Sequence, residues 1–116
     1  MIGMKKLTHI EHPLTGAKLY IAVKDFKMPM TWPEAVQACK ELGSGWRLPN
    51  IDELEAIYLH LHKKKLGDFK DKWYWSSTQH TDRSMPNAWV FKFDQGISNG
   101  YTAQDNPQLV RAIFIE

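Results

Sequence analysis

Apolar and polar positions alternate over a short stretch near the start of the chain, which is the pattern of a half-buried β-strand. Leu19, Ile21 and Val23 fall on one face of residues 18–24. Before them, residues 1–17 are rich in turn-forming residues, so we expect an irregular lead-in. The period of two returns later in the chain and predicts four more strands, at 73–78, 88–93, 97–103 and 109–115.

Between the first strand and the later ones the apolar spacing becomes helical, and each of two segments begins with a capping box. Thr31 precedes Glu34 by three residues, and Asn50 precedes Glu53 by the same distance. This arrangement satisfies the free N–H groups of a first helical turn. The apolar stripe of the first helix consists of Trp32, Ala35, Val36, Cys39 and Leu42. The stripe of the second consists of Ile51, Leu54, Ile57, Tyr58 and Leu61. Residues 44–49 are expected to form a tight connection between the helices.

The order of elements is one strand, two helices and four strands. It indicates an α+β fold with an antiparallel sheet, because parallel sheets alternate strands with helices along the chain. The helices and the sheet need each other to bury their apolar faces. The chain of 116 residues is long enough for one hydrophobic core and too short for two. We therefore predict one domain over residues 1–116.

Composition and charge narrow the classes of function only slightly. The chain is 43% hydrophobic and 24% charged, as in ordinary globular proteins. Its 15 Lys and Arg against 13 Asp and Glu give a net charge of +2, which is no strong indication of a nucleic-acid or membrane partner. No apolar stretch approaches the roughly 20 residues of a membrane span, and no signal peptide is visible. We therefore expect a protein that is cytoplasmic or is released as part of an assembly.

The residue types that carry catalysis occur without the partners that catalysis requires. Cys39 is the one cysteine, so no intramolecular disulfide can form, and its place on a helical stripe indicates a buried thiol. His60 and His62 lie about 200° apart around a helix and cannot hold one metal ion together. His9 and His12 lie in a turn-rich segment without a Cys-x-x-Cys partner, so we interpret them as surface residues. We expect no metal, no cofactor and no enzymatic activity.

Two groups of basic residues remain as candidates for binding an anion. Arg47 and Arg111 adjoin apolar residues, and we favour guanidinium groups that tie strands or loops to a helix carboxylate over groups that bind an anion. Five lysines lie close to Asp68 and Asp71, giving a local net charge of +3. These lysines are Lys63, Lys64, Lys65, Lys70 and Lys72. A sulfated glycan or a nucleic acid could use them, but a solvated helix end is the more ordinary explanation.

Several motifs, in their order and spacing, resemble one family of bacterial domains. They occupy residues 31–39, 45–49, 53–54, 74–78, 88–93 and 110–112. Over most of its length the chain is similar to the family named for the C-terminal domain of the Legionella collagen-like protein. The resemblance implies a C-type-lectin-like fold, in which the N- and C-terminal strands pair and two helices flank a twisted antiparallel sheet. It also implies a non-catalytic domain of cell or phage surfaces, and the member that names the family binds sulfated glycans.

Calcium-dependent lectins of this superfamily carry Glu-Pro-Asn and Trp-Asn-Asp signatures, whose oxygen atoms hold the ion. This chain has Met85-Pro86-Asn87 and Trp75-Ser76-Ser77 at the nearest positions. The carboxylates that calcium prefers are therefore missing, and no calcium site is expected.

In folds of this kind the long loops form the ligand face, and the longest polar loops of this chain are expected at 79–87 and 99–106. We predict that these loops bind a glycan or a protein surface. The candidate residues are His80, Asp82, Arg83, Asn87, Asn99, Tyr101, Gln104 and Asp105. The alternative is a structural domain of a surface or phage complex that forms homo-oligomers. A nucleic-acid partner is not expected.

Overall fold

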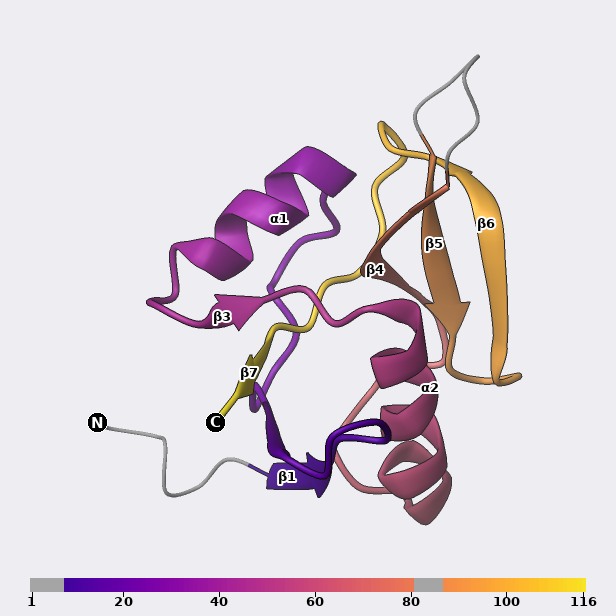
Figure 1. Cartoon of the computed structure of the whole chain (residues 1–116). Helices are drawn as coiled ribbons and strands as arrows, with labels where there is room; N and C mark the ends of the chain where they lie inside the picture. Colours follow the sequence, from indigo (N-terminus) through magenta and orange to yellow (C-terminus); the bar gives the residue numbers. More distant parts are fainter. Residues whose placement is uncertain (1–7, 81–86) are drawn as a thin grey trace.

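The computed structural model describes residues 8–80 and 87–116, which form two antiparallel sheets and two α-helices (Figure 1). The first sheet has the order β1-β2-β7-β3, with bounds Thr8–Glu11, Lys18–Ile21, Ile113–Ile115 and Trp46–Arg47. The second has the order β4-β5-β6, with bounds Trp73–His80, Asn87–Lys92 and Ile97–Ala103. Helix α1 spans Trp32–Lys40, α2 spans Ile51–His60, and the short 3-10 helix η2 spans His62–Lys64. The predicted α+β class is confirmed.

The N- and C-terminal strands pair, as the family resemblance implies. β2 and β7 are antiparallel neighbours, with Ile21 opposite Ile113. The one predicted sheet is nevertheless divided in two, because residues 108–112 leave the ladder and make separate backbone links. Leu109 bonds to β4, whereas Ala112 bonds to the loop that follows β2. The predicted last strand therefore shortens to β7.

Both helices begin at the predicted capping boxes. Glu34 accepts a hydrogen bond from the Thr31 N–H at 3.0 Å, and Asn50 accepts one from the Glu53 N–H at 2.8 Å. Leu42, placed on the first apolar stripe, is 48% exposed because α1 ends before it. In the described part of the chain, no helix is long and apolar enough to cross a membrane.

The first sheet contains two strands that the sequence pattern does not indicate. β1 lies inside the expected irregular lead-in, and β3 lies inside the expected connection at 44–49. Both are short, and Ile10 is the single buried apolar residue of β1, so neither has a periodic signal of its own. The predicted continuation of β2 to residue 24 is wrong, because the strand ends at Ile21 and Val23 is 55% exposed.

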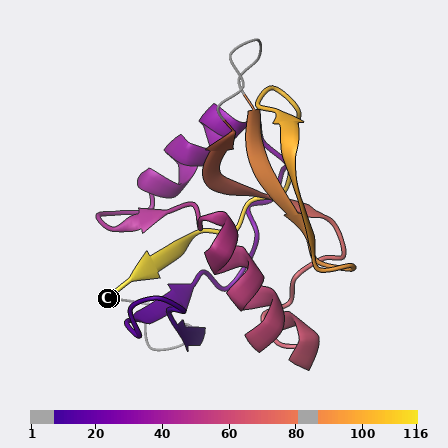
Figure 2. The same ribbon diagram turned by 45° about the vertical axis from the view of Figure 1, so that its right-hand side comes forward.

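Helix α2 lies between the first sheet and the second in both views (Figures 1 and 2). Successive strand residues point to opposite faces, and β4 uses both. Tyr74 packs into the apolar cluster that contains Leu54 of α2, whereas Trp75 packs into the cluster that contains Ala35 and Cys39 of α1. The second sheet is thus buried on two sides, which holds the ends of its strands in fixed positions.

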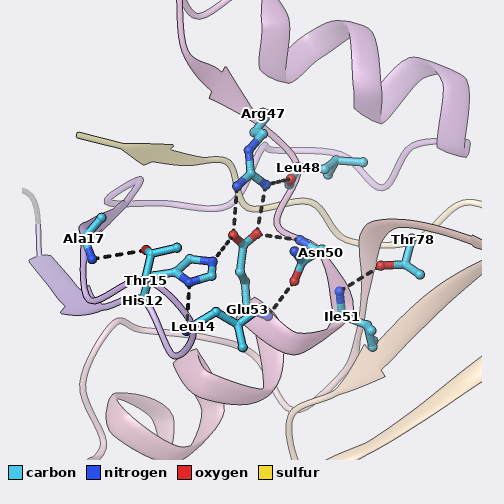
Figure 3. Close-up of polar contacts among 10 residues, drawn as sticks. All are labelled: His12, Leu14, Thr15, Ala17, Arg47, Leu48, Asn50, Ile51, Glu53 and Thr78. Atoms are coloured by element: carbon cyan, nitrogen blue, oxygen red, sulfur yellow. Dashed lines mark hydrogen bonds and ion pairs between the residues drawn. The ribbon is translucent and has the colours of Figure 1, made fainter.

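A buried carboxylate on α2 joins three segments of the chain (Figure 3). Glu53 is fully buried, and Arg47 of β3 donates two hydrogen bonds to it, each of 2.8 Å. The backbone N–H of Asn50 donates a third, of 2.7 Å. The cluster supplies the structural role that we favour for Arg47.

His12 completes this cluster and is not the surface residue that the sequence predicts. Its Nε2 lies 2.8 Å from the Glu53 carboxylate, and its Nδ1 accepts a hydrogen bond from the Leu14 N–H at 3.1 Å. Because Nδ1 accepts, Nε2 carries the proton that is donated to Glu53. The turn after β1 is thereby fastened to α2.

A buried guanidinium near the C-terminus joins three further segments. Arg111 is 2% exposed and donates to Asp25 at 2.7 Å. It also donates to the carbonyl oxygens of Ala22, Gly67 and Asp68, at 3.0, 2.8 and 3.0 Å. Arg111 is structural as expected, although its carboxylate partner comes from a loop and not from a helix. It fixes the loop after β2 and the loop before β4 against the C-terminal segment.

Replacement of Glu53 by Gln is expected to lower the free energy of unfolding by about 2–3 kcal/mol at neutral pH, because charged hydrogen bonds to a buried group are lost. Burial alone would raise the pKa of Glu53, but hydrogen bonds from Arg47 and the Asn50 amide hold that pKa below its usual range. The charged form therefore stabilises the fold above about pH 4.3, the ordinary pKa of Glu. This contribution is lost as the pH falls through the lower pKa of the folded state.

Urea unfolding of Glu53→Gln and the parent across acidic pH measures both effects. The variant should show lower stability at neutral pH and a flatter loss of stability on acidification. Glu55→Gln, which removes an exposed carboxylate from the same helix beyond its first turn, is the control and should follow the parent. Parallel pH profiles for Glu53→Gln and the parent would contradict the assigned role of this carboxylate.

Candidate binding site

Four of the eight residues predicted for the ligand face, His80, Asn87, Gln104 and Asp105, lie at one end of the second sheet. His80 is the cross-strand neighbour of Asn87, and Asn87 is in turn opposite Ala103. Gln104 and Asp105 directly follow β6. The remaining predicted residues fall in two groups. Asn99 and Tyr101 lie within β6, and Asp82 and Arg83 lie outside the described residues.

Two of these residues help to hold the loop after β6 in place. Asn87 is 7% exposed, and its carbonyl oxygen accepts a hydrogen bond from the Gln104 side chain at 3.2 Å. The carbonyl oxygen of Gln104 accepts from the Trp32 N–H at 2.8 Å, which links this loop to the start of α1. Asn99 and Asp105 are exposed. At this end of the sheet, the loop after β6 is therefore held by hydrogen bonds, and some of its polar groups face solvent.

The five predicted lysines are all exposed, but four of them are divided between two cavities and Lys64 lines neither. Lys63 and Lys65 line a cavity of about 500 Å³ together with Asp68, Asp71 and Asp94, whose carboxylates offset their charge. Lys70 and Lys72 line a different cavity. The local excess of positive charge along the sequence is thus not one surface in the fold.

The second cavity brings together lysines that are far apart in the sequence, and we call it the lysine groove. It has a volume of about 500 Å³. Lys27, Lys70, Lys72, Lys92 and Trp73 line it. Pro107, Gln108 and Leu109 form its other wall. Among the described residues, Asp71 is the single carboxylate of the lining, and it lies 3.2 Å from His62. Sequence reasoning misses Lys27 and Lys92 because neither has a basic neighbour.

The fold fixes the base of the lysine groove by hydrogen bonds to its backbone. The Tyr74 hydroxyl accepts from the Lys70 N–H at 2.9 Å and donates to Asp25 at 2.7 Å. Asp25 is the carboxylate that pairs with Arg111. The buried ion pair therefore sets the position of Lys70, and the lysine side chain itself stays exposed.

The charges of the groove are only partly neutralised. Lys92 lies 3.7 Å from Asp94, and its ammonium is 5.9 Å from the centroid of the Trp73 ring. Within residues 8–80 and 87–116, Lys27, Lys70 and Lys72 form no ion pair. Three unneutralised ammonium groups beside a half-buried indole make a site that attracts anions.

The described residues offer no catalytic constellation. Cys39 is fully buried, and the Ser76 hydroxyl donates to the carbonyl oxygen of Trp89 at 2.7 Å. Over the same part of the chain, no group of three or more His, Cys, Asp or Glu side chains could hold a metal ion. The arrangement is suited to binding through charge and shape.

These elements define the class of the protein: the fold is C-type-lectin-like. A solved structure with this fold is that of EMS16, described as an antagonist of the collagen receptor integrin alpha2beta1. The two structures agree with a TM-score of 0.62 at 13% sequence identity, over 84% of this chain and 92% of that chain. At that identity the likeness concerns the fold alone. The sequence model of the Lcl C-terminal domain matches residues 10–114, and the chain belongs to this family. No curated protein matches the sequence.

Burial should make Cys39 unreactive in the folded protein. It raises the pKa of the thiol to about 12, from an ordinary value of 9.0. The thiolate fraction at mildly alkaline pH then falls about a thousandfold. We expect a thiol reagent such as dithiobis-nitrobenzoate to label the native protein very slowly and the urea-unfolded protein at once. Rapid stoichiometric labelling of the folded chain would contradict this structural role.

Proposed function

We propose that this domain is a non-catalytic binding module and that its lysine groove binds an anionic chain such as an acidic or sulfated glycan. The observation that carries the proposal is the convergence of Lys27, Lys70 and Lys72, none with an acidic partner among the described residues, around Trp73. Family membership is consistent with a binding role.

The physical basis is electrostatic. A polyanion carries condensed counterions, and each lysine that contacts it releases some of them to the solvent, so affinity falls steeply with salt. The apolar indole of Trp73 and the wall at Pro107 and Leu109 add surface that a sugar ring can cover. Since the backbone of Lys70 is already held, ordering on binding at this position is confined to the lysine side chain.

The end of the second sheet is a second candidate, for a neutral glycan or a protein surface. His80, Asn87 and Ala103 are cross-strand neighbours there, and the hydrogen bond from the Gln104 side chain to the Asn87 carbonyl oxygen ties the loop after β6 to β5. Exposed Asp105, directly after β6, supplies a hydrogen-bonding group on this scaffold. Binding at this end would depend little on salt.

The first test compares two triple variants on heparin resin with a salt gradient. Lys27→Ala/Lys70→Ala/Lys72→Ala removes the three unpaired cations of the groove. Lys63→Ala/Lys64→Ala/Lys65→Ala removes the same charge from outside the groove, two of the three lysines being in the neighbouring cavity, and is the matched control. We expect the groove variant to elute at much lower salt, with the log–log salt slope of binding reduced by about 2–3, and the control to elute close to the parent.

Thermal unfolding of both variants shows whether either change disturbs the fold. Flow-through of the parent at low salt, or an equal loss for the two variants, would contradict the assignment of anion binding to the lysine groove. Retention that persists in the groove variant and resists salt would direct attention to the end of the second sheet.

A further inference from the structure

Two grooves of opposite chemical character lie on either side of one ridge of the molecule. The ridge is residues 27–30, and Pro29 lines both grooves. On one side is the lysine groove. On the other is a groove of about 650 Å³, which we call the acidic groove. Pro33 and Ala38 of α1 line it, together with Glu34, Gln37 and Glu41.

The ridge is rigid and apolar at its centre. Met30 and Gln108 exchange two backbone hydrogen bonds, each of 2.9 Å, and the indole N–H of Trp75 donates to the Met30 carbonyl oxygen at 2.7 Å. Met28 is nevertheless 70% exposed. A large apolar side chain is therefore presented to solvent on a braced segment, with charge on both sides of it.

The carboxylates of the acidic groove are available to a cation from outside. Glu34 accepts the Thr31 N–H at 3.0 Å, and Glu41 accepts the Gln37 side chain at 3.2 Å. In the described part of the chain neither carboxylate forms an ion pair. The same face thus carries unneutralised acids on one side of the ridge and unneutralised lysines on the other.

We propose that this face is a self-association surface, and that its partner is a second copy of this chain. In a twofold contact the same patch meets itself in the reverse sense. An axis passing near Pro29 sets the acidic groove of each copy against the lysine groove of the other, so both halves of the contact are attractive. Met28 and Pro29 of the two copies meet at the centre, which gives the apolar core and polar rim of a protein interface.

Self-association goes beyond the proposed anion binding and does not depend on it. The two do share Lys27, Lys70 and Lys72, so a polyanion in the lysine groove excludes the second copy. Heparin binding by a chain that stays monomeric would overturn the dimer and leave the binding proposal intact. A salt-sensitive dimer that does not bind heparin would overturn the binding proposal and leave the dimer intact.

The test is charge reversal on each side of the ridge, read out by sedimentation velocity of the full chain over a range of concentrations. Gln37→Lys/Glu41→Lys reverses the acidic side and keeps the Glu34 capping box. Lys70→Glu/Lys72→Glu reverses the basic side. We expect the parent to dimerise with an affinity that salt weakens. Each variant alone should show a dimer dissociation constant raised at least about tenfold, because like charges then face each other.

Mixing the two variants makes the test specific. In the mixed pair a mainly basic face meets a mainly acidic one, so a heterodimer should form although each variant alone dimerises poorly. A chain carrying all four changes should dimerise again. Lys63→Glu/Lys64→Glu, placed outside the face, is the control and should dimerise like the parent. A parent that is monomeric at about millimolar concentration would overturn the proposal. So would a dimer that neither charge reversal weakens, or a mixture of the two variants that forms no heterodimer.

Discussion

The architecture depends on one buried ion pair, between Arg111 and Asp25. A guanidinium removed from water costs several kcal/mol unless its donors are met, and here a carboxylate and three carbonyl oxygens meet them. These partners come from the loop after β2 and the loop before β4. Both loops are irregular, and the loop after β2 makes only separate backbone hydrogen bonds to residues 108–112, without forming a named strand. The ion pair therefore holds these loops in place, as regular secondary structure does elsewhere, and it also positions residues of the lysine groove.

Glu53 plays the corresponding part on the other side of the core. It fastens β3 and the turn after β1 to α2 through Arg47 and His12. The chain has one cysteine and can form no intramolecular disulfide, so buried charge and packing carry the constraint that a cross-link would supply. Such a cluster tolerates few substitutions, because removal of one partner leaves the others buried and unpaired. That asymmetry explains why short strands such as β3 persist although their own pairing is slight.

The parts of the fold that local rules determine could be predicted from the sequence, and the parts that depend on distant contacts could not. Thr31 and Asn50 cap their helices through neighbours three residues away. β1 and β3, in contrast, are strands only because β2 and β7 pair with them. The same division applies to the site. Lys70 and Lys72 are visible as part of a basic run, but their true neighbours, Lys27 and Lys92, are set by the topology. The burial of His12 does not follow from the sequence, because its partner Glu53 lies 41 residues away.

The proposed anion site and the proposed dimer surface are linked by the same lysines, and the linkage has a definite sign. A ligand that binds only the free lysine groove draws the population towards monomer, and self-association weakens the apparent affinity for that ligand by the same factor. Salt weakens both contacts, since both rest on exposed charges. Their relative strength is therefore decided by what differs between them. A second copy adds the apolar contact at Met28 and Pro29, whereas a long polyanion adds further charges that extend beyond the groove. A high local concentration of this chain favours self-association, and a dense anionic surface favours polyanion binding.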